Sequence, residues 1–141
     1  MSKILFVDDE KAFLDTLIKR LEKRKINPRA VYSGEEALTF LAENTSTDVV
    51  VLDVKMPGMD GLETLSEIKK QFPLVEVIML TGHATVESAI DGMKLGAFDY
   101  MMKPCDLDLL MEKLDKAVAK KQGHEEKIME ARLKEIAGQR V

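Results

Sequence analysis

The feature that most constrains the fold is a set of four short apolar runs, each of which ends at a polar or charged residue. The runs are rich in valine, isoleucine, leucine and methionine, and they cover residues 4–7, 49–52, 75–80 and 98–102. Continuous runs of this kind are typical of strands that are buried on both faces, as in a parallel sheet covered by helices on each side. The four runs therefore predict an α/β domain.

Each run is followed by a stretch in which apolar residues recur with the spacing of an α-helix. A weaker strand at residues 29–32 brings the number of strand and helix pairs to five. The turn residues agree with this pattern, because Ser33 precedes the second helix and Pro73 follows the third. Asp106 comes just before the last helical stretch, and we expect it to cap that helix.

The helical pattern changes after Lys120. Gly123 follows, and then comes a second short apolar set made of Ile128, Met129, Leu133 and Ile136. We interpret residues 1–120 as the compact domain and residues 121–141 as a helical tail or linker, which either continues the last helix or forms a second one. A solvated or frayed extension is the alternative to a linker or dimerisation surface, because short isolated helices are marginal in water.

Composition and charge narrow the class of protein. The 141 residues, of which 45% are hydrophobic and 33% charged, are typical of one globular domain. A net charge of -4 disfavours nonspecific binding of nucleic acid. The single cysteine, Cys105, rules out an internal disulfide, and no run approaches the roughly 20 apolar residues of a membrane span. We therefore expect a cytoplasmic protein that binds neither nucleic acid nor membrane directly.

Polar side chains follow the four runs at the point where each predicted strand ends. Asp8 and Asp9 follow the first run, Asp53 the second, Thr81 the third and Lys103 the fourth. Because the carboxyl ends of parallel strands meet at one edge of a sheet, where open α/β folds bind ligands, we expect these side chains to be neighbours. Carboxylates are ligands for Mg²⁺, and a hydroxyl and an ammonium can contact phosphoryl oxygens. The pattern predicts a site for a divalent cation and a phosphoryl group.

Each of these residues also has a simpler structural explanation. Asp8 or Asp9 could cap the following helix, and Asp53 could cap the turn at residues 57–58. Thr81 fits a strand end, and a lysine such as Lys103 usually lies at the surface. A carboxylate that closes a fully apolar run needs a partner, however, and beside a metal it could attack phosphorus to form an acyl phosphate. The combination of all five side chains favours the functional interpretation.

The chain resembles the receiver domains of bacterial response regulators over nearly all of residues 3–120. Four motifs carry the resemblance, namely VDDE at residues 7–10, DVKMPGMDG at 53–61, TGHA at 81–84 and Lys103-Pro104. Together with AFDY at residues 97–100, they look most like receivers joined to AAA+ activators of the nitrogen-regulator type. The resemblance implies a flavodoxin-like, doubly wound (βα)5 fold with a five-stranded parallel sheet of order 2-1-3-4-5 and an extended C-terminal helix.

The resemblance also implies roles for individual residues. Asp53 is the phosphoacceptor, and the ligands of Mg²⁺ are the carboxylates of Asp8, Asp9 and Asp53 and the backbone carbonyl of Lys55. The Lys103-Pro104 bond is expected to be cis, because an X-Pro bond is the common place for a cis peptide.

A conformational switch is implied as well. Thr81 and Lys103 contact the phosphoryl group, Thr81 shifts toward it, and Tyr100 turns inward to fill the space that is vacated. The face built from the fourth helix, the fifth strand and the fifth helix then changes, as expected for a two-state element biased by one new charge. Lys55 and His83 lie where receivers control the access of a hydrolytic water.

These roles describe a signalling switch rather than an enzyme, apart from its own Mg²⁺-dependent phosphorylation and dephosphorylation. The expected partners are a histidine kinase as phosphodonor, a downstream output domain or protein, and a second copy bound through the C-terminal helices. An alternative is that the chain is the N-terminal receiver fragment of a transcriptional activator.

Three other classes fit less well. A phosphatase of the haloacid-dehalogenase type needs a second acidic residue two positions after the nucleophilic aspartate, where this chain has Lys55. A degenerate receiver, acting without phosphorylation, lacks some of the five site residues, and all five are present here. A flavodoxin-like nucleotide binder needs a glycine-rich loop after the first strand, where this chain has residues 8–10, all of them acidic.

Overall fold

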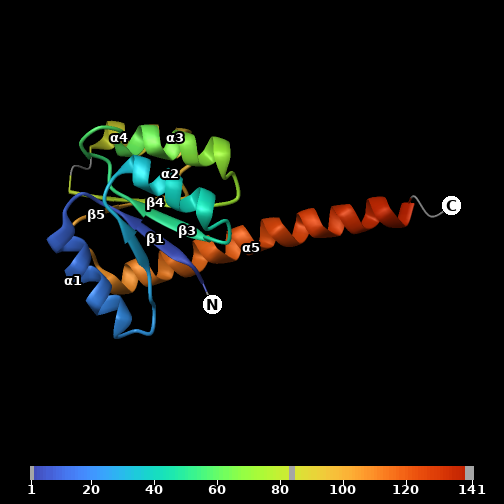
Figure 1. Ribbon diagram of the computed structural model, residues 1–141, viewed down its shortest axis with the longest axis horizontal. Coiled ribbons are helices and arrows are strands. Elements are labelled where there is room, and N and C mark those ends of the chain that lie inside the picture. The colour runs from blue at the N-terminus through green and yellow to red at the C-terminus, as the bar shows by residue number, and fades with distance from the viewer. Residues whose placement is uncertain (1, 83–84, 139–141) are drawn as a thin grey trace.

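The computed structural model describes residues 2–82 and 85–138, which contain a single five-stranded sheet (Figure 1). All neighbouring strands are parallel, and their order is β2-β1-β3-β4-β5. The strands are β1 (Ile4–Val7), β2 (Arg29–Val31), β3 (Val49–Leu52), β4 (Glu76–Thr81) and β5 (Asp99–Met102). The predicted fold class and strand order are confirmed, including the short strand that the sequence marked only weakly.

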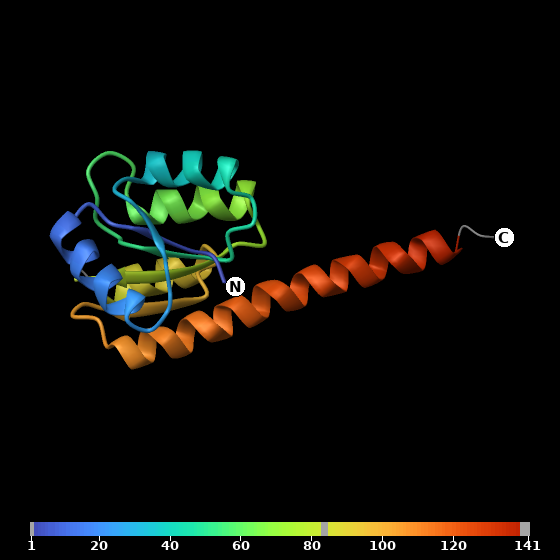
Figure 2. The same ribbon diagram turned by 60° about the horizontal axis from the view of Figure 1, so that its bottom comes forward.

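Helices cover both faces of the sheet, with α1 and α5 on one side and α2, α3 and α4 on the other (Figures 1 and 2). The helices are α1 (Lys11–Glu22), α2 (Gly34–Glu43), α3 (Gly61–Gln71), α4 (Val86–Lys94) and α5 (Leu107–Gly138). The sheet has a hydrophobic core on each face, and successive residues of a strand point into opposite cores. In β3, Val49 and Val51 pack toward α1 and α5, whereas Val50 and Leu52 pack toward α2 and α3. This two-sided burial explains why the strands read as continuous apolar runs.

Side-chain caps fix where several helices begin. Ser33 accepts a hydrogen bond from the backbone N–H of Glu36 at the start of α2, and Asp60 does the same for Glu63 in α3. Asp106 accepts from the N–H of Leu109 at 3.1 Å, which confirms the predicted cap of α5. Each cap satisfies a backbone donor that has no partner within its helix.

The last helix continues without a break past Gly123 and leaves the domain as an extended arm (Figure 2). Of the two predicted alternatives for the tail, the structure therefore contains a continuation of α5. The helix stays attached to the domain as far as Lys121, which is buried and forms an ion pair with Asp48 at 3.1 Å. Among the described residues, no helix combines the length and apolarity needed to cross a membrane.

Candidate functional site

The carboxyl edge of the sheet brings the first two acidic segments together. Val7 of β1 lies in register with Leu52 of β3, so Asp8 and Asp53 leave neighbouring strands at the same level. Both carboxylates are buried, with exposed fractions of 3% and 2%. Two buried carboxylates at one sheet edge need compensating positive charge, since an unpaired buried charge is strongly destabilising.

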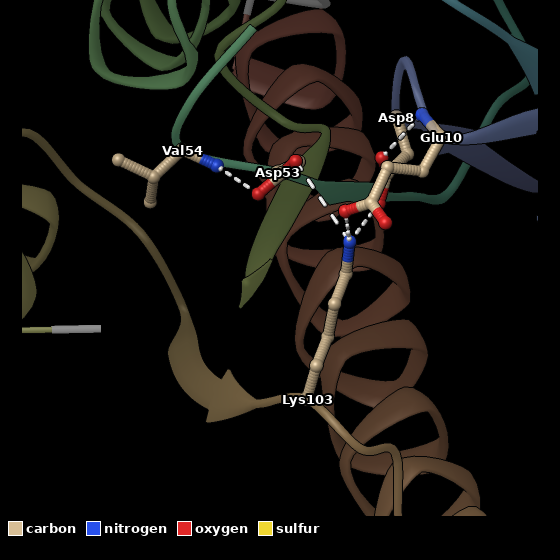
Figure 3. Close-up of polar contacts among 5 residues, drawn as sticks. All are labelled: Asp8, Glu10, Asp53, Val54 and Lys103. Carbon is tan, nitrogen blue, oxygen red and sulfur yellow. Dashed lines mark hydrogen bonds and ion pairs between the residues drawn. The ribbon is translucent and has the colours of Figure 1, made fainter. Parts of the chain in front are cut away.

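Lys103 supplies that charge from the end of β5 (Figure 3). Its Nζ lies 2.7 Å from Oδ2 of Asp8, 2.9 Å from Oε1 of Glu10 and 3.8 Å from Oδ2 of Asp53. Only 11% of the Lys103 side chain is exposed. The peptide bond between Lys103 and Pro104 is cis. One ammonium thus contacts three carboxylates, which come from the segments directly after β1 and β3.

Asp53 is held in place by its own loop. Its Oδ1 accepts a hydrogen bond from the backbone N–H of Val54 at 2.8 Å, while Oδ2 is the oxygen that faces Lys103. The start of α3 lies directly against this segment, because a Cβ on Gly61 would come within 2.0 Å of the Asp53 carbonyl oxygen. Glycine is therefore required at position 61 for the segment that carries Asp53 and α3 to pack this closely.

Glu10 belongs to the acidic cluster, although it is not among the predicted site residues. Carboxylate oxygens of Asp8, Glu10 and Asp53 all lie within 4.8 Å of one another. Asp9, which was predicted as a ligand, is exposed and is not a member of this cluster. Adjacent residues point in different directions at the end of a strand, so the alternation after β1 could have indicated that Asp8 and Glu10 share a side.

The pKa values of Asp8 and Lys103 are both raised by their surroundings, for different reasons. Burial raises the pKa of Asp8, and the hydrogen bonds from Lys103 and from the N–H of Glu10 only partly offset this effect. Burial lowers the pKa of Lys103, but hydrogen bonds to Asp8 and Glu10 and attraction to Asp53 outweigh it, so that the pKa is raised. Lys103 is therefore a fixed cation at neutral pH.

The remaining predicted residues flank this centre. Thr81 is the last residue of β4 and is fully buried, and its carbonyl accepts the backbone N–H of Lys103 at 3.0 Å. Lys55 is exposed in the loop between β3 and α3. Tyr100 is half-buried in β5, and its hydroxyl lies 2.9 Å from Oγ of Ser88 in α4. His83 lies outside the described residues.

The geometry suits a cation and a tetrahedral anion. Clustered carboxylates provide hard oxygen ligands, and the ammonium beside Asp53 can balance negative charge on a group attached to that residue. A pocket at the opposite edge of the sheet, lined by Asn27, Phe40 and Asn44 among other described residues, has no carboxylate in its lining.

Residues 4–115 match the response regulator receiver domain family, which is most of the chain. The chain belongs to this family. The receiver domain is 40% identical over 116 residues to the transcriptional regulatory protein ZraR of Salmonella typhimurium, a match that covers 82% of this chain and 26% of ZraR. It is 36% identical over 113 residues to the DNA-binding transcriptional regulator NtrC of Klebsiella pneumoniae, covering 80% of this chain and 24% of NtrC.

Solved structures agree with the sequence relatives. A receiver domain protein from Clostridium thermocellum superimposes with a TM-score of 0.81 at 39% identity, covering 86% of this chain and 98% of that one. NtrX from Brucella abortus gives a TM-score of 0.79 at 32% identity, covering 89% of this chain and 29% of NtrX. The receiver domain thus spans about a quarter of the length of the curated relatives it matches. The predicted family, and its likeness to nitrogen-regulator receivers, are confirmed.

Proposed function

We propose that this receiver domain accepts a phosphoryl group on Asp53 from the phosphohistidine of a histidine kinase. The observation that supports the proposal best is the contact set of Lys103, whose ammonium lies between Asp8, Glu10 and Asp53 at the carboxyl edge of the sheet. A buried carboxylate beside a fixed cation is a suitable nucleophile, because the cation balances the charge that the incoming group brings.

The proposed transfer is a substitution at phosphorus. Oδ2 of Asp53 attacks the phosphorus atom, a P–O bond forms, the P–N bond to the imidazole breaks, and its electron pair returns to the nitrogen. Lys103 stabilises the charge on the phosphoryl oxygens, and the hydroxyl of Thr81 donates a hydrogen bond to one of them. Attack of water on the same phosphorus later releases phosphate and regenerates the carboxylate, so the protein turns over only its own phosphoryl group.

The carboxylates fit the Mg²⁺ ion that receivers use. Mg²⁺ prefers hard oxygen ligands. Asp8 and Asp53 offer carboxylate oxygens that lie within 4.8 Å of each other. We assign Asp8, Asp9, Asp53 and the backbone carbonyl of Lys55 to the ion. When bound, it supplies positive charge that offsets the negative charge of the phosphoryl oxygens.

The signal is proposed to leave through the face formed by α4, β5 and α5. Thr81 shifts toward the phosphoryl group, and Tyr100 turns inward. Exposed apolar side chains make this face suited to binding a partner, and they include Val86, Ile90, Met93 and Met102. We assign Lys55 and His83 to control of the phosphate lifetime.

The relatives suggest where the signal goes. ZraR and NtrC are much longer proteins, and we propose that this domain likewise controls an output domain of a cytoplasmic transcriptional activator and does not itself bind nucleic acid or membrane. We place the boundary between the domain and its tail near residue 120. The tail is proposed to form a homodimer through Met129, Leu133 and Ile136, which lie on one side of the extended helix and are more than half exposed.

The test is labelling with acetyl phosphate and Mg²⁺. The wild-type protein should gain a label that is stable in acid and labile to base and hydroxylamine, and chelation of Mg²⁺ should prevent labelling. Asp53→Asn should remove the label. Asp60→Asn is the matched control, since asparagine caps a helix as well as aspartate and α3 should begin as before. Equal labelling of Asp53→Asn and wild type would contradict the proposal.

A further inference from the structure

The Lys103 ammonium also lies close to an aromatic ring. Its Nζ lies 4.2 Å from the centroid of the Phe13 ring. The other cation-to-ring distances among the described residues are 5.0 to 5.6 Å. An ammonium this close to a ring face is attracted by the quadrupole of the ring, and the attraction grows when the ammonium is desolvated, as that of Lys103 is.

The ring itself is firmly placed. Phe13 lies in the first turn of α1, is half-buried, and packs against the core cluster between the sheet and the helices α1 and α5. Its position therefore depends on the core rather than on the charges of the site. Glu10, by contrast, is 58% exposed and can move away from the ammonium.

The two kinds of partner act differently on the lysine. Asp8 and Glu10 bind the ammonium through oxygen atoms, and they compete for it with the oxygens of a phosphoryl group on Asp53. A phenyl ring accepts no strong hydrogen bond, so it attracts the ammonium without occupying its N–H donors. Phe13 can hold the ammonium at one place while its oxygen partners change.

We propose that Phe13 is a positioning residue for the phosphorylation reaction, which holds the Lys103 ammonium over its ring within reach of Asp53. This inference rests on the proposed function, because the lysine is assigned to the phosphoryl group there. It names a residue that acts through Lys103 and does not touch the phosphoryl group itself.

The kinetic test compares variants that remove or keep the ring. Phe13→Leu should lower the rate of labelling by acetyl phosphate about three- to tenfold, in line with the strength of such contacts. Phe13→Tyr keeps the ring and should restore the rate to within about twofold of wild type. Phe98→Leu is the matched control, because Phe98 is also half-buried against the same core and lies 5.6 Å from the ammonium of Lys120, which is not assigned to the site.

A double substitution separates positioning from a general loss of packing. In a Lys103→Met background, Phe13→Leu should lower the labelling rate no further, since the ring would have no ammonium to hold. A further decrease in that background, or equal rates for Phe13→Leu and wild type, would overturn the inference.

An NMR measurement tests the contact without any phosphorylation. The Cε protons of Lys103 should show an upfield ring-current shift in wild type and in Phe13→Tyr, and the shift should be absent in Phe13→Leu. Wild-type protein that shows the shift but takes no label at Asp53 would contradict the proposed function and leave the contact in place. Wild-type protein without the shift would overturn the inference about Phe13 even if Asp53 is labelled.

Discussion

Lys103 is the residue on which the charge balance of the site depends. Three carboxylates of the described chain come within 4.8 Å of one another, and this one ammonium contacts all of them. Asp8 and Asp53 are almost fully buried, so water can screen them only weakly. In the absence of a metal ion, the Lys103 ammonium supplies the positive charge that offsets the burial and mutual repulsion of these carboxylates.

Lys103→Met should therefore destabilise the metal-free protein by about 3 kcal/mol, because it leaves buried carboxylates without their counter-charge. Mg²⁺ should restore much of this loss, since it replaces the missing positive charge. Urea unfolding with and without Mg²⁺ measures both effects. Lys116→Met is the control, because Lys116 forms an exposed pair with Glu112 that should contribute about 0.5 kcal/mol or less. Equal midpoints for the two variants in the absence of metal would contradict this account.

At the residue scale, the sequence indicated which side chains gather at the sheet edge but not how they contact one another. Asp8, Asp53 and Lys103 could be predicted because each directly follows an apolar run. Glu10 does not follow an apolar run directly, and only the alternation of side chains after β1 indicates that it lies on the same side as Asp8. The helical spacing of apolar residues predicts Phe13 only as a core residue. Its contact with the Lys103 ammonium could not be predicted, because it depends on the distance between α1 and the end of β5.

At the level of elements, the start of α3 packs tightly against the segment that carries Asp53. Gly61→Ala should cost about 3 kcal/mol of stability, because the new Cβ meets backbone atoms of Asp53 and Val54 that cannot move aside easily. Gly123→Ala is the matched substitution in α5, where nothing lies within 4 Å of the new Cβ. It should stabilise the helix by up to about 1 kcal/mol. Thermal unfolding of both variants tests the pair, and similar melting temperatures would contradict the predicted difference.

The point where α5 leaves the domain is fixed by a buried ion pair. Lys121 contacts Asp48 at 3.1 Å and Glu125 at 3.2 Å. Burial lowers the pKa of Lys121, but hydrogen bonds to these two carboxylates outweigh it and raise the pKa above 10.5. The contribution of the lysine to stability is therefore present at neutral pH and is lost as the pH rises through the raised pKa of the folded state.

Lys121→Met should destabilise the protein by about 2 kcal/mol at neutral pH, because the buried Asp48 carboxylate loses its counter-charge and keeps its hydrogen bond from the N–H of Lys3. Adding Asp48→Asn should recover most of the loss, since no unpaired charge then remains. Urea unfolding of the single and double variants measures the coupling. A double variant less stable than Lys121→Met alone would show that the pair does not act as described.

The elements themselves were largely predictable, for reasons that differ from one to the next. The run of four apolar residues in β3 predicts a buried strand. The helices α2 and α3 each begin after a residue type that commonly caps helices, namely Ser33 and Asp60. β2 is only three residues long and none of them is fully buried, so its pattern is weak. The path of α5 beyond residue 120 depends on the contact of Lys121 with Asp48, 73 positions away, which no local pattern contains.

On the scale of the whole molecule, the arm formed by the end of α5 is the surface proposed for self-association. Its apolar residues Met129, Leu133 and Ile136 are 54% to 57% exposed. A chain that ends at Glu126 keeps the contacts of Lys121 and should remain folded and open to phosphorylation. It should lose self-association, because the apolar stripe is removed. Sedimentation velocity of the two chains tests this, and an unchanged mass would exclude the arm as a dimer element.

The central claim is that the carboxylate of Asp53 receives the phosphoryl group, and the most direct measurement is chemical mapping of the modified residue. The protein is phosphorylated with acetyl phosphate and Mg²⁺, reduced with borohydride, digested and sequenced by mass spectrometry. Reduction converts an aspartyl phosphate to homoserine, so we expect homoserine at position 53 and aspartate at positions 8, 9 and 60. Homoserine at another position, with aspartate intact at 53, would contradict the account.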